Sequence, residues 1–141
     1  MSKRFDAKAI LQEHGYRATL GRIRILELLR KQTKPRTVAD LHRALSVKGI
    51  DQVTLYRALE AFTASRIVRR IDLGQGNAHS YELADTHHHH IVCTDCGMIK
   101  DFEICDADTI ADRALKQVRG FASISEHAFE LFGLCITCAK K

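Results

Sequence analysis

Proline is nearly absent from this chain of 141 residues, glycine is not abundant, and long apolar runs are missing. One proline and eight glycines, with 45% hydrophobic and 28% charged residues, exclude a fibrous or disordered chain and allow a buried core. No apolar run is long enough for a membrane span, and Asp6 and Glu13 interrupt the segment where a signal peptide would lie. We therefore expect one globular domain or two small ones, in the cytoplasm and without a membrane partner.

Charge is distributed unevenly along the chain. Residues 1–84 hold 16 basic and 8 acidic residues, a net charge of +8, whereas residues 85–141 hold 6 basic and 9 acidic residues, a net charge of −3. A basic half followed by an acidic half suggests a polyanion-binding module beside a cation-binding one. Uneven surface charge without a function would give the same net charges.

Hydrophobic periodicity in the first half predicts four short helices. We expect helices at about 6–14, from Thr19 to the region before Pro35, from Thr37 to Gly49, and from Asp51 onward. Caps support these starts, because Thr37 and Asp40 have capping-box spacing and Gly15 can close the first helix. The expected buried residues of the second and third helices are Leu20, Ile23, Leu26, Leu29, Leu41, Ala44 and Leu45.

The fourth helix presents a candidate DNA-binding face. Its apolar stripe is Leu55, Ala58, Leu59 and Phe62, at helical spacing. Arg57 therefore points away from the core, with Thr54 and Tyr56 on its flanks, and such side chains suit phosphates and base edges. An ordinary solvated helix face is the alternative.

After Ser65 the apolar period changes to two, which predicts a β-hairpin around the turn-rich residues 74–77. Helices followed by a hairpin describe a winged helix-turn-helix over residues 1–84, with a hinge at about 83–86. Residues 87–141 then predict a small α/β domain. It has strands near 91–92 and 98–103, a helix whose stripe begins at Ile110 and which Gly120 closes, and a strand over 121–132. The fold class is thus α+β.

The five cysteines indicate a metal site more than a disulfide framework. Four of them form two Cys-x-x-Cys pairs, Cys93 with Cys96 and Cys135 with Cys138. Two such pairs supply four thiolates to one tetrahedral ion, and a sphere without an open position suits a single structural Zn(II). A thiol redox pair or buried thiols are the alternatives, and Cys105 is left unexplained.

Four consecutive histidines, His87 to His90, precede the first cysteine pair. Along a strand, His88 and His90 face one side and His87 and His89 the other, so one strand can supply two metal sites. Glu82 and Asp101 are available to the first pair, and Asp108 and His127 to the second. A core histidine is the alternative for His127, because it shares strand parity with Phe129 and Leu131. Such mixed spheres suit Zn(II), Fe(II), Mn(II) or Ni(II).

The order of these motifs resembles that of the ferric uptake regulator (Fur) family of metal-sensing repressors. The resemblance spans about residues 5–138 and rests on the segments His87–Gly97, Thr54–Arg57 and Gly133–Cys138. It implies a homodimer in which a winged helix binds palindromic double-stranded operator DNA and an α/β domain dimerises around structural zinc.

The resemblance also implies roles for individual residues. It places Tyr56 and Arg57 on the recognition helix, and Arg17 near the minor groove. Its structural zinc ligands are Cys93, Cys96, Cys135 and Cys138. Its sensing site is Glu82, His88, His90 and Asp101, and its second site is His87, His89, Asp108 and His127.

The chain departs from the family pattern in two places. No histidine stands between His14 and His42, where the family often has a sensing-site ligand, and Pro35 or a neighbour occupies that position. The linker is one residue shorter than in iron-sensing members, so Asp72 or His79 could replace Glu82. Loss of that histidine, with a second cysteine pair that reads Gly-Leu-Cys-x-x-Cys from Gly133, resembles zinc-sensing members, with regulatory Zn(II), more than iron-sensing ones with Fe(II) or peroxide-sensing ones.

Two functions from other classes compete with a repressor. A metalloenzyme needs an open metal position and a general base, but the chain has no His-Glu-x-x-His and no His-x-Glu ahead of Pro-Cys-x-x-Cys. We therefore expect no enzyme. A thiol redox or zinc-storage protein explains the cysteines and histidines but not the basic half or Arg57.

Overall fold

The computed structural model describes residues 4–74, 76 and 78–141. The chain divides into two compact units, Met1–Thr86 and His87–Lys141, called here the N-terminal and C-terminal units. Gln75 and Asn77 of the expected hairpin turn lie outside the described residues.

The helices of the N-terminal unit begin where the sequence supplies caps. They are α1 (Ala7–Glu13), α2 (Leu20–Lys31), α3 (Val38–Leu45), the short 3-10 helix η1 (Ser46–Lys48) and α4 (Gln52–Ala64). Asp6, Thr19, Thr37 and Asp51 each accept a hydrogen bond from the first turn of the helix that follows. Thr37 and Asp40 form the predicted capping box. The four expected helix starts are confirmed.

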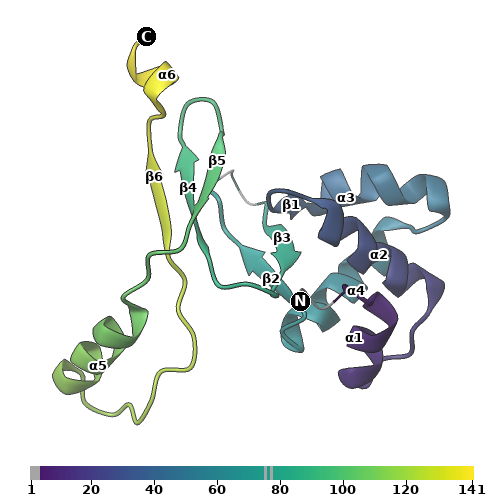
Figure 1. The fold of residues 1–141 in the computed structure, drawn as a ribbon, viewed down its shortest axis with the longest axis horizontal. Helices are drawn as coiled ribbons and strands as arrows, with labels where there is room; N and C mark the ends of the chain where they lie inside the picture. Colours follow the sequence, from purple (N-terminus) through teal and green to yellow (C-terminus); the bar gives the residue numbers. More distant parts are fainter. Residues whose placement is uncertain (1–3, 75, 77) are drawn as a thin grey trace. The chain divides into compact units, whose positions relative to one another are not determined.

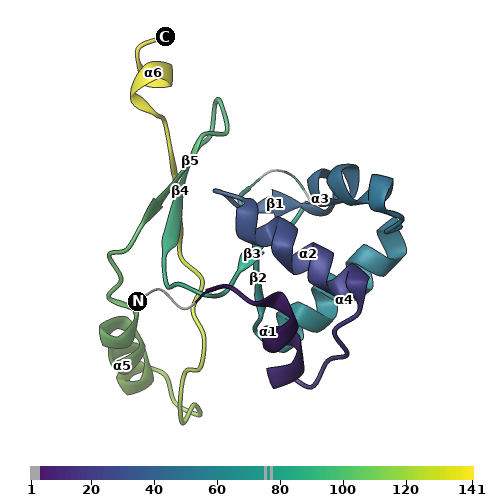
Figure 2. The same cartoon turned by 45° about the vertical axis from the view of Figure 1, so that its right-hand side comes forward.

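A three-stranded sheet accompanies these helices (Figure 1). Strand β2 (Val68–Ile71) pairs antiparallel with β3 (Ser80–Leu83), as the predicted hairpin requires. A third strand, β1 (Arg36–Thr37), pairs with the other edge of β3. The sequence did not predict β1, because two residues are too short to show a period. The helices α2, α3 and α4 with this sheet form a winged helix-turn-helix (Figures 1 and 2).

The core of the N-terminal unit is continuous. It contains Leu11, Leu26, Leu41 and the whole predicted stripe of α4, with Phe62 fully buried. Two expected core positions are wrong: Leu20 is 60% exposed and Ala44 is exposed, while Ile25 and Val38 are buried. Leu20 is the first residue of α2, so fewer neighbours surround it than surround the middle turns.

The C-terminal unit is built on a second three-stranded sheet. Strand β4 (His89–Cys93) lies in the middle, with β5 (Ile99–Phe102) antiparallel on one side and β6 (Glu130–Gly133) parallel on the other. A short helix, α6 (Ile136–Ala139), follows β6. The two expected strands around the first cysteine pair are therefore present.

Two expectations for the rest of this unit are corrected. Helix α5 (Ala107–Gln117) forms, but it buries no residue, and Ile110 of its predicted stripe is 63% exposed. Figures 1 and 2 show why, because α5 stands apart from the sheet of its own unit. The predicted strand over 121–132 is only the four residues of β6, since residues 121–129 have no strand partner among the described residues.

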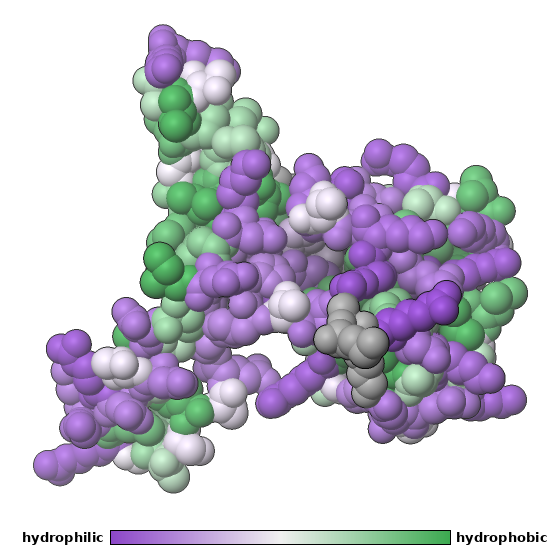
Figure 3. Space-filling view, in the orientation of Figure 1, coloured by the Kyte–Doolittle hydropathy of each residue, from purple (hydrophilic) through white to green (hydrophobic). Residues whose placement is uncertain are grey.

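The surface of the C-terminal unit is unusually apolar. In Figure 3 hydrophobic residues gather along its strands, and the exposed large side chains include Phe121, Phe129, Leu131, Phe132 and Leu134. Such a patch indicates a protein interface. Within the described residues, no helix has the length and apolar character needed to cross a bilayer.

Candidate DNA-binding surface and metal centres

Helix α4 buries one face completely and exposes the other. Thr54, Tyr56 and Arg57 are all exposed, and Tyr56 keeps 46% of its surface accessible. Thr54 is held at the helix start by Asp51, which accepts from its amide at 2.8 Å and from its hydroxyl at 3.1 Å. These three residues thus form an exposed polar group on α4, and their DNA contacts stay a prediction.

Arg17 lies in an anchored loop between α1 and α2. The neighbouring Tyr16 donates its hydroxyl to the carbonyl of Ala61 on α4 at 2.9 Å and packs edge-on against Phe62. Arg22 donates to the carbonyl of Arg17 at 3.1 Å and covers the Tyr16 ring. Arg17 itself is exposed. The sequence did not show that Tyr16 and Arg22 fix this loop, because Ala61 lies 45 positions away from Tyr16.

The four paired cysteines come together in the C-terminal unit. The four Sγ atoms all lie within 4.8 Å of one another, and those of Cys96 and Cys135 are 3.8 Å apart. Zn–S bonds of about 2.3 Å in a tetrahedron place neighbouring sulfurs about 3.8 Å apart. The donor set and its geometry therefore fit a zinc ion. All five cysteines are free of disulfides.

The backbone around this cluster favours a thiolate. Amides of Cys96 and Cys135 donate to the sulfur of Cys93, which lowers the pKa of that thiol to about 6. The pKa of Cys138 is raised instead, because its thiol donates to the carboxylate of Asp95 and lies beside the other sulfurs. Four thiols this close ionise together only beside a cation, and a bound divalent metal would supply that charge.

The histidines alternate as predicted, with His89 and His90 at the start of β4 and His87 and His88 directly before it. The rings of His88 and His90 are 5.0 Å apart, and those of His87 and His89 are 4.9 Å apart. His90 is buried between two carboxylates, because Asp101 on β5 and Glu130 on β6 are its direct cross-strand partners. Its ring nitrogens lie 3.8 Å from Asp101 and 4.0 Å from Glu130.

Glu130 is a neighbour of His90 that sequence reasoning missed. It belongs to a segment 40 positions further along the chain, and only the parallel pairing of β4 with β6 brings it opposite His90. The available signal was that Glu130 and the next residue, Leu131, point to opposite faces of a predicted strand. The register between that strand and β4 could not be read from the sequence.

Glu82 lies in the N-terminal unit on β3. Its carboxylate accepts from Arg69 on β2 at 2.9 Å, and the same guanidinium donates to the carbonyl of Thr86 at 2.9 Å. Asp72 accepts from the amide of Gly74, and His79 is exposed. Neither Asp72 nor His79 belongs to a cluster of metal-binding side chains in the part of the chain that the structure describes.

The other two histidines of the run belong to a second cluster. Ligand atoms of His87, His89, His127 and Cys105 all lie within 4.8 Å of one another. Among the described residues, this group contains Cys105 and not Asp108, which is in the first turn of α5. The metal role predicted for Asp108 stays a prediction.

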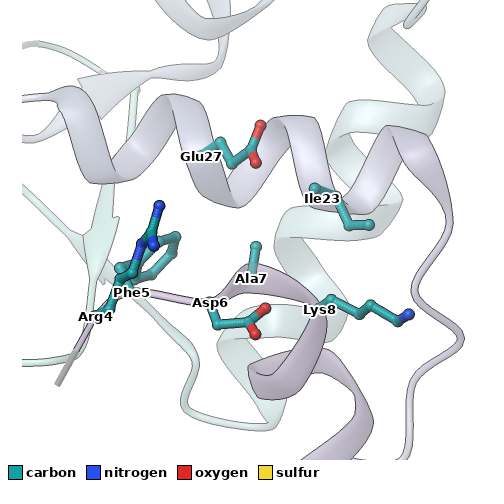
Figure 4. A pocket seen from close by; sticks show the side chains of 7 residues that line it. All are labelled: Arg4, Phe5, Asp6, Ala7, Lys8, Ile23 and Glu27. Carbon is teal, nitrogen blue, oxygen red and sulfur yellow. The ribbon is translucent and has the colours of Figure 1, made fainter.

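A pocket at the start of α1 carries no such cluster. Figure 4 shows its lining by Arg4, Asp6, Lys8 and Glu27, with Phe5, Ala7 and Ile23 between them. Charges of both signs face this space, and no histidine or cysteine lines it. Most of the candidate functional residues therefore lie on α4 and in the clusters of the C-terminal unit.

Comparison with known proteins decides the family. The model of the ferric uptake regulator family matches residues 13–132. The chain belongs to this family. It is 35% identical to the ferric uptake regulation protein of Bordetella parapertussis, covering 92% of this chain and 94% of that protein. It is also 32% identical to the peroxide operon regulator of Bacillus subtilis, with coverages of 96% and 93%.

A solved structure extends the likeness to a third branch of the Fur family. A zinc uptake regulator in complex with zinc and DNA is 25% identical to this chain and superposes with a TM-score of 0.68. The match covers 95% of this chain and 91% of that one. The chain is thus a metal-responsive transcription regulator, and family members act as DNA-binding dimers. Family membership favours a transcription regulator over the thiol redox and zinc-storage functions. The three relatives are named for ferric, peroxide and zinc regulation, so they do not identify the regulatory metal.

Proposed function

We propose that this Fur family member is a repressor that uses Zn(II) as its co-repressor. The observation that carries the proposal is the pairing of a fully packed α4, which exposes Thr54, Tyr56 and Arg57, with a following unit rich in metal-binding clusters. Residues 1–84 would bind the operator, and residues 87–141 would dimerise. Zinc is favoured over iron because Pro35 or a neighbour stands where the family often has a histidine ligand. We place the protein in the cytoplasm, where thiols stay reduced.

The proposed metal sites follow the clusters. Cys93, Cys96, Cys135 and Cys138 would hold one structural Zn(II) per subunit. Glu82, His88, His90 and Asp101 would bind the regulatory ion, and His87, His89, Asp108 and His127 a further one. Bound zinc would supply positive charge that draws these ligands together.

Two residues of the proposed sensing set have partners outside it. Glu82 would exchange its bond with Arg69 for the metal, and His90 has Glu130 beside one ring nitrogen. His90 and Asp101 already lie 3.8 Å apart, so both could bind one ion. Glu82 belongs to the N-terminal unit and Asp101 to the C-terminal unit. Ligation by the whole set would therefore couple metal binding to the DNA-binding helices. By linkage, DNA would then tighten metal binding by the same factor.

The test is a metal titration with DNA binding as the readout. The protein is stripped of weakly bound metal and titrated with Zn(II) or anaerobic Fe(II). Binding is measured to a palindromic duplex selected with the metal-loaded protein, with half-sites about one turn, ~34 Å, apart. Metal per subunit is counted in parallel. We expect one retained zinc and a gain in DNA affinity with added Zn(II).

His90→Ala is the matched variant, because it removes a proposed sensing ligand and leaves all cysteines in place. It should keep one zinc and lose the metal-dependent gain. Activation by Fe(II) alone would overturn zinc as co-repressor and favour an iron- or peroxide-sensing regulator. An unchanged response of His90→Ala would remove His90 from the sensing site.

A further inference from the structure

Cys105 lies in a cluster of three histidines drawn from three segments. His89 is the first residue of β4 and His87 lies two residues before it, Cys105 comes from the loop before α5, and His127 from the segment before β6. All four ligand atoms lie within 4.8 Å of one another, and Cys105 Sγ is 3.5 Å from His127 Nε2.

The surroundings hold this cluster in place. His89 is buried, and its ring packs against Phe102 and Phe129 with centroids 5.5 Å away in each case. The rings of His87 and His127 are 5.3 Å apart. Cys105 is half-buried, so its thiol is partly shielded while the site stays reachable from solvent.

The one sulfur–nitrogen distance fits a tetrahedral metal site. With Zn–S at about 2.3 Å and Zn–N at about 2.0–2.1 Å, a tetrahedron separates the two donors by about 3.5–3.6 Å. The observed 3.5 Å lets both atoms bind one tetrahedral ion, and it also fits a hydrogen bond between the two side chains.

We propose that the thiolate of Cys105, with His87, His89 and His127, forms a four-coordinate metal site that takes Zn(II) in preference to Fe(II) or Mn(II). A thiolate with three imidazoles is a softer donor set than one completed by a carboxylate, and tetrahedral geometry suits Zn(II). Cys105 thus replaces Asp108 as the fourth ligand of this site. The inference refines the second site of the proposed function, and metal binding by the free protein tests it without DNA.

Cobalt(II) gives a direct readout of the thiolate. The chain is prepared with one zinc in the four-cysteine cluster, and Co(II) is added without oxygen while zinc is counted. Because the other four thiols remain occupied by zinc, a near-ultraviolet thiolate-to-cobalt charge-transfer band reports Cys105. We expect this band, and the intense visible bands of tetrahedral Co(II), with the added cobalt.

Three variants separate the possible ligands. Cys105→Ser should lose the charge-transfer band and weaken Zn(II) binding at this site more than about 100-fold, beyond the 10–100-fold typical of residues that only orient a ligand. Asp108→Asn removes the carboxylate that the family pattern places in this site, and it should keep the band and change affinity less than about 10-fold if Cys105 is the fourth ligand. His90→Ala should also keep the band, which separates this site from the sensing site.

The proposal is overturned if the wild-type protein shows no charge-transfer band, or if Cys105→Ser retains it. It is also overturned if Asp108→Asn loses the added metal while Cys105→Ser keeps it. Alkylation of Cys105, followed by mass spectrometry, gives an independent check, because added Zn(II) should slow it. An unchanged alkylation rate with zinc would contradict ligation even if the cobalt spectra were ambiguous.

Discussion

The two units of this regulator use different means to hold their structure. The N-terminal unit has a continuous core of aliphatic side chains around Phe62, and its helices carry side-chain caps. In the C-terminal unit the buried hydrophobic residues are Val92, Cys93 and Cys138, and α5 buries none of its residues. Its buried polar residues are the histidines His89 and His90.

This difference shows where the stability of each unit comes from. Apolar burial provides the driving force in the N-terminal unit. The C-terminal unit has too small a core to fold on apolar burial alone, so metal ligation and a partner chain must supply the rest. Its exposed aromatic and aliphatic residues fit the dimeric state of the family.

Loss of the four-cysteine site should have the largest effect on the difference in stability between the two units. Cys96→Ser should release the structural zinc and unfold the C-terminal unit, because zinc binding at such sites contributes on the order of 10 kcal/mol to folding. The N-terminal unit should remain folded. All three tyrosines lie in that unit and the chain has no tryptophan, so tyrosine fluorescence reports on it alone.

The measurement combines zinc counting, size-exclusion chromatography and tyrosine fluorescence during denaturation. Cys105→Ser is compared with it, since this change also removes a thiol of the C-terminal unit but should keep the zinc of the four-cysteine site. A zinc-free Cys96→Ser dimer with wild-type stability would contradict the role of metal in this unit.

A core truncation in the other unit should have the next largest effect. Phe62 is fully buried, so Phe62→Ala should lower the free energy of unfolding of the N-terminal unit by about 3–5 kcal/mol. Phe121 is 69% exposed, and Phe121→Ala should leave that unfolding transition unchanged. Urea denaturation followed by tyrosine fluorescence measures both. Equal losses from the two variants would remove the distinction between the units.

Arg57→Ala should separate DNA binding from metal binding. Removing an exposed guanidinium from α4 should weaken operator binding by about 1–3 kcal/mol, with zinc content and dimerisation unchanged. Lys116→Ala on α5 removes the same charge elsewhere and serves as the control. Fluorescence anisotropy with the selected duplex measures both variants. Wild-type affinity of Arg57→Ala would show that α4 is not the recognition helix.

The capping box of α3 should give the smallest effect. Thr37→Ala should cost about 1 kcal/mol of stability in the N-terminal unit. The Thr37 hydroxyl donates to Asp40 and lowers the pKa of that carboxyl below its usual 3.8. A lowered pKa stabilises the fold above the ordinary value and loses that contribution as pH falls through the lowered one.

The difference between wild type and Thr37→Ala should therefore shrink as the pH falls below about 4, as Asp40 is protonated. Urea denaturation at several pH values measures this difference. Val38→Ala, which truncates an adjacent side chain without touching the box, should show a difference that does not depend on pH. A constant difference for Thr37→Ala would contradict the role of Asp40 in the box.

Much of the N-terminal unit follows from local sequence. Caps at Thr19, Thr37 and Asp51 and the α4 stripe act within a few residues, so their spacing is visible in the chain. Predictions failed where the structure depends on packing or strand pairing with residues far away in the chain. Leu20 is exposed at a helix end, β1 is too short to show a period, and residues 121–129 lack a strand partner in the described chain.

The sequence by itself determined the donors and their local pairing: two Cys-x-x-Cys turns, and four histidines that alternate on a strand because successive side chains point to opposite faces. The tertiary structure decided which distant residues complete each set. The register of β4 with β6 puts Glu130 beside His90, and the loop before α5 brings Cys105 to His127. Register and loop path depend on packing between segments far apart in the chain, which no local pattern records.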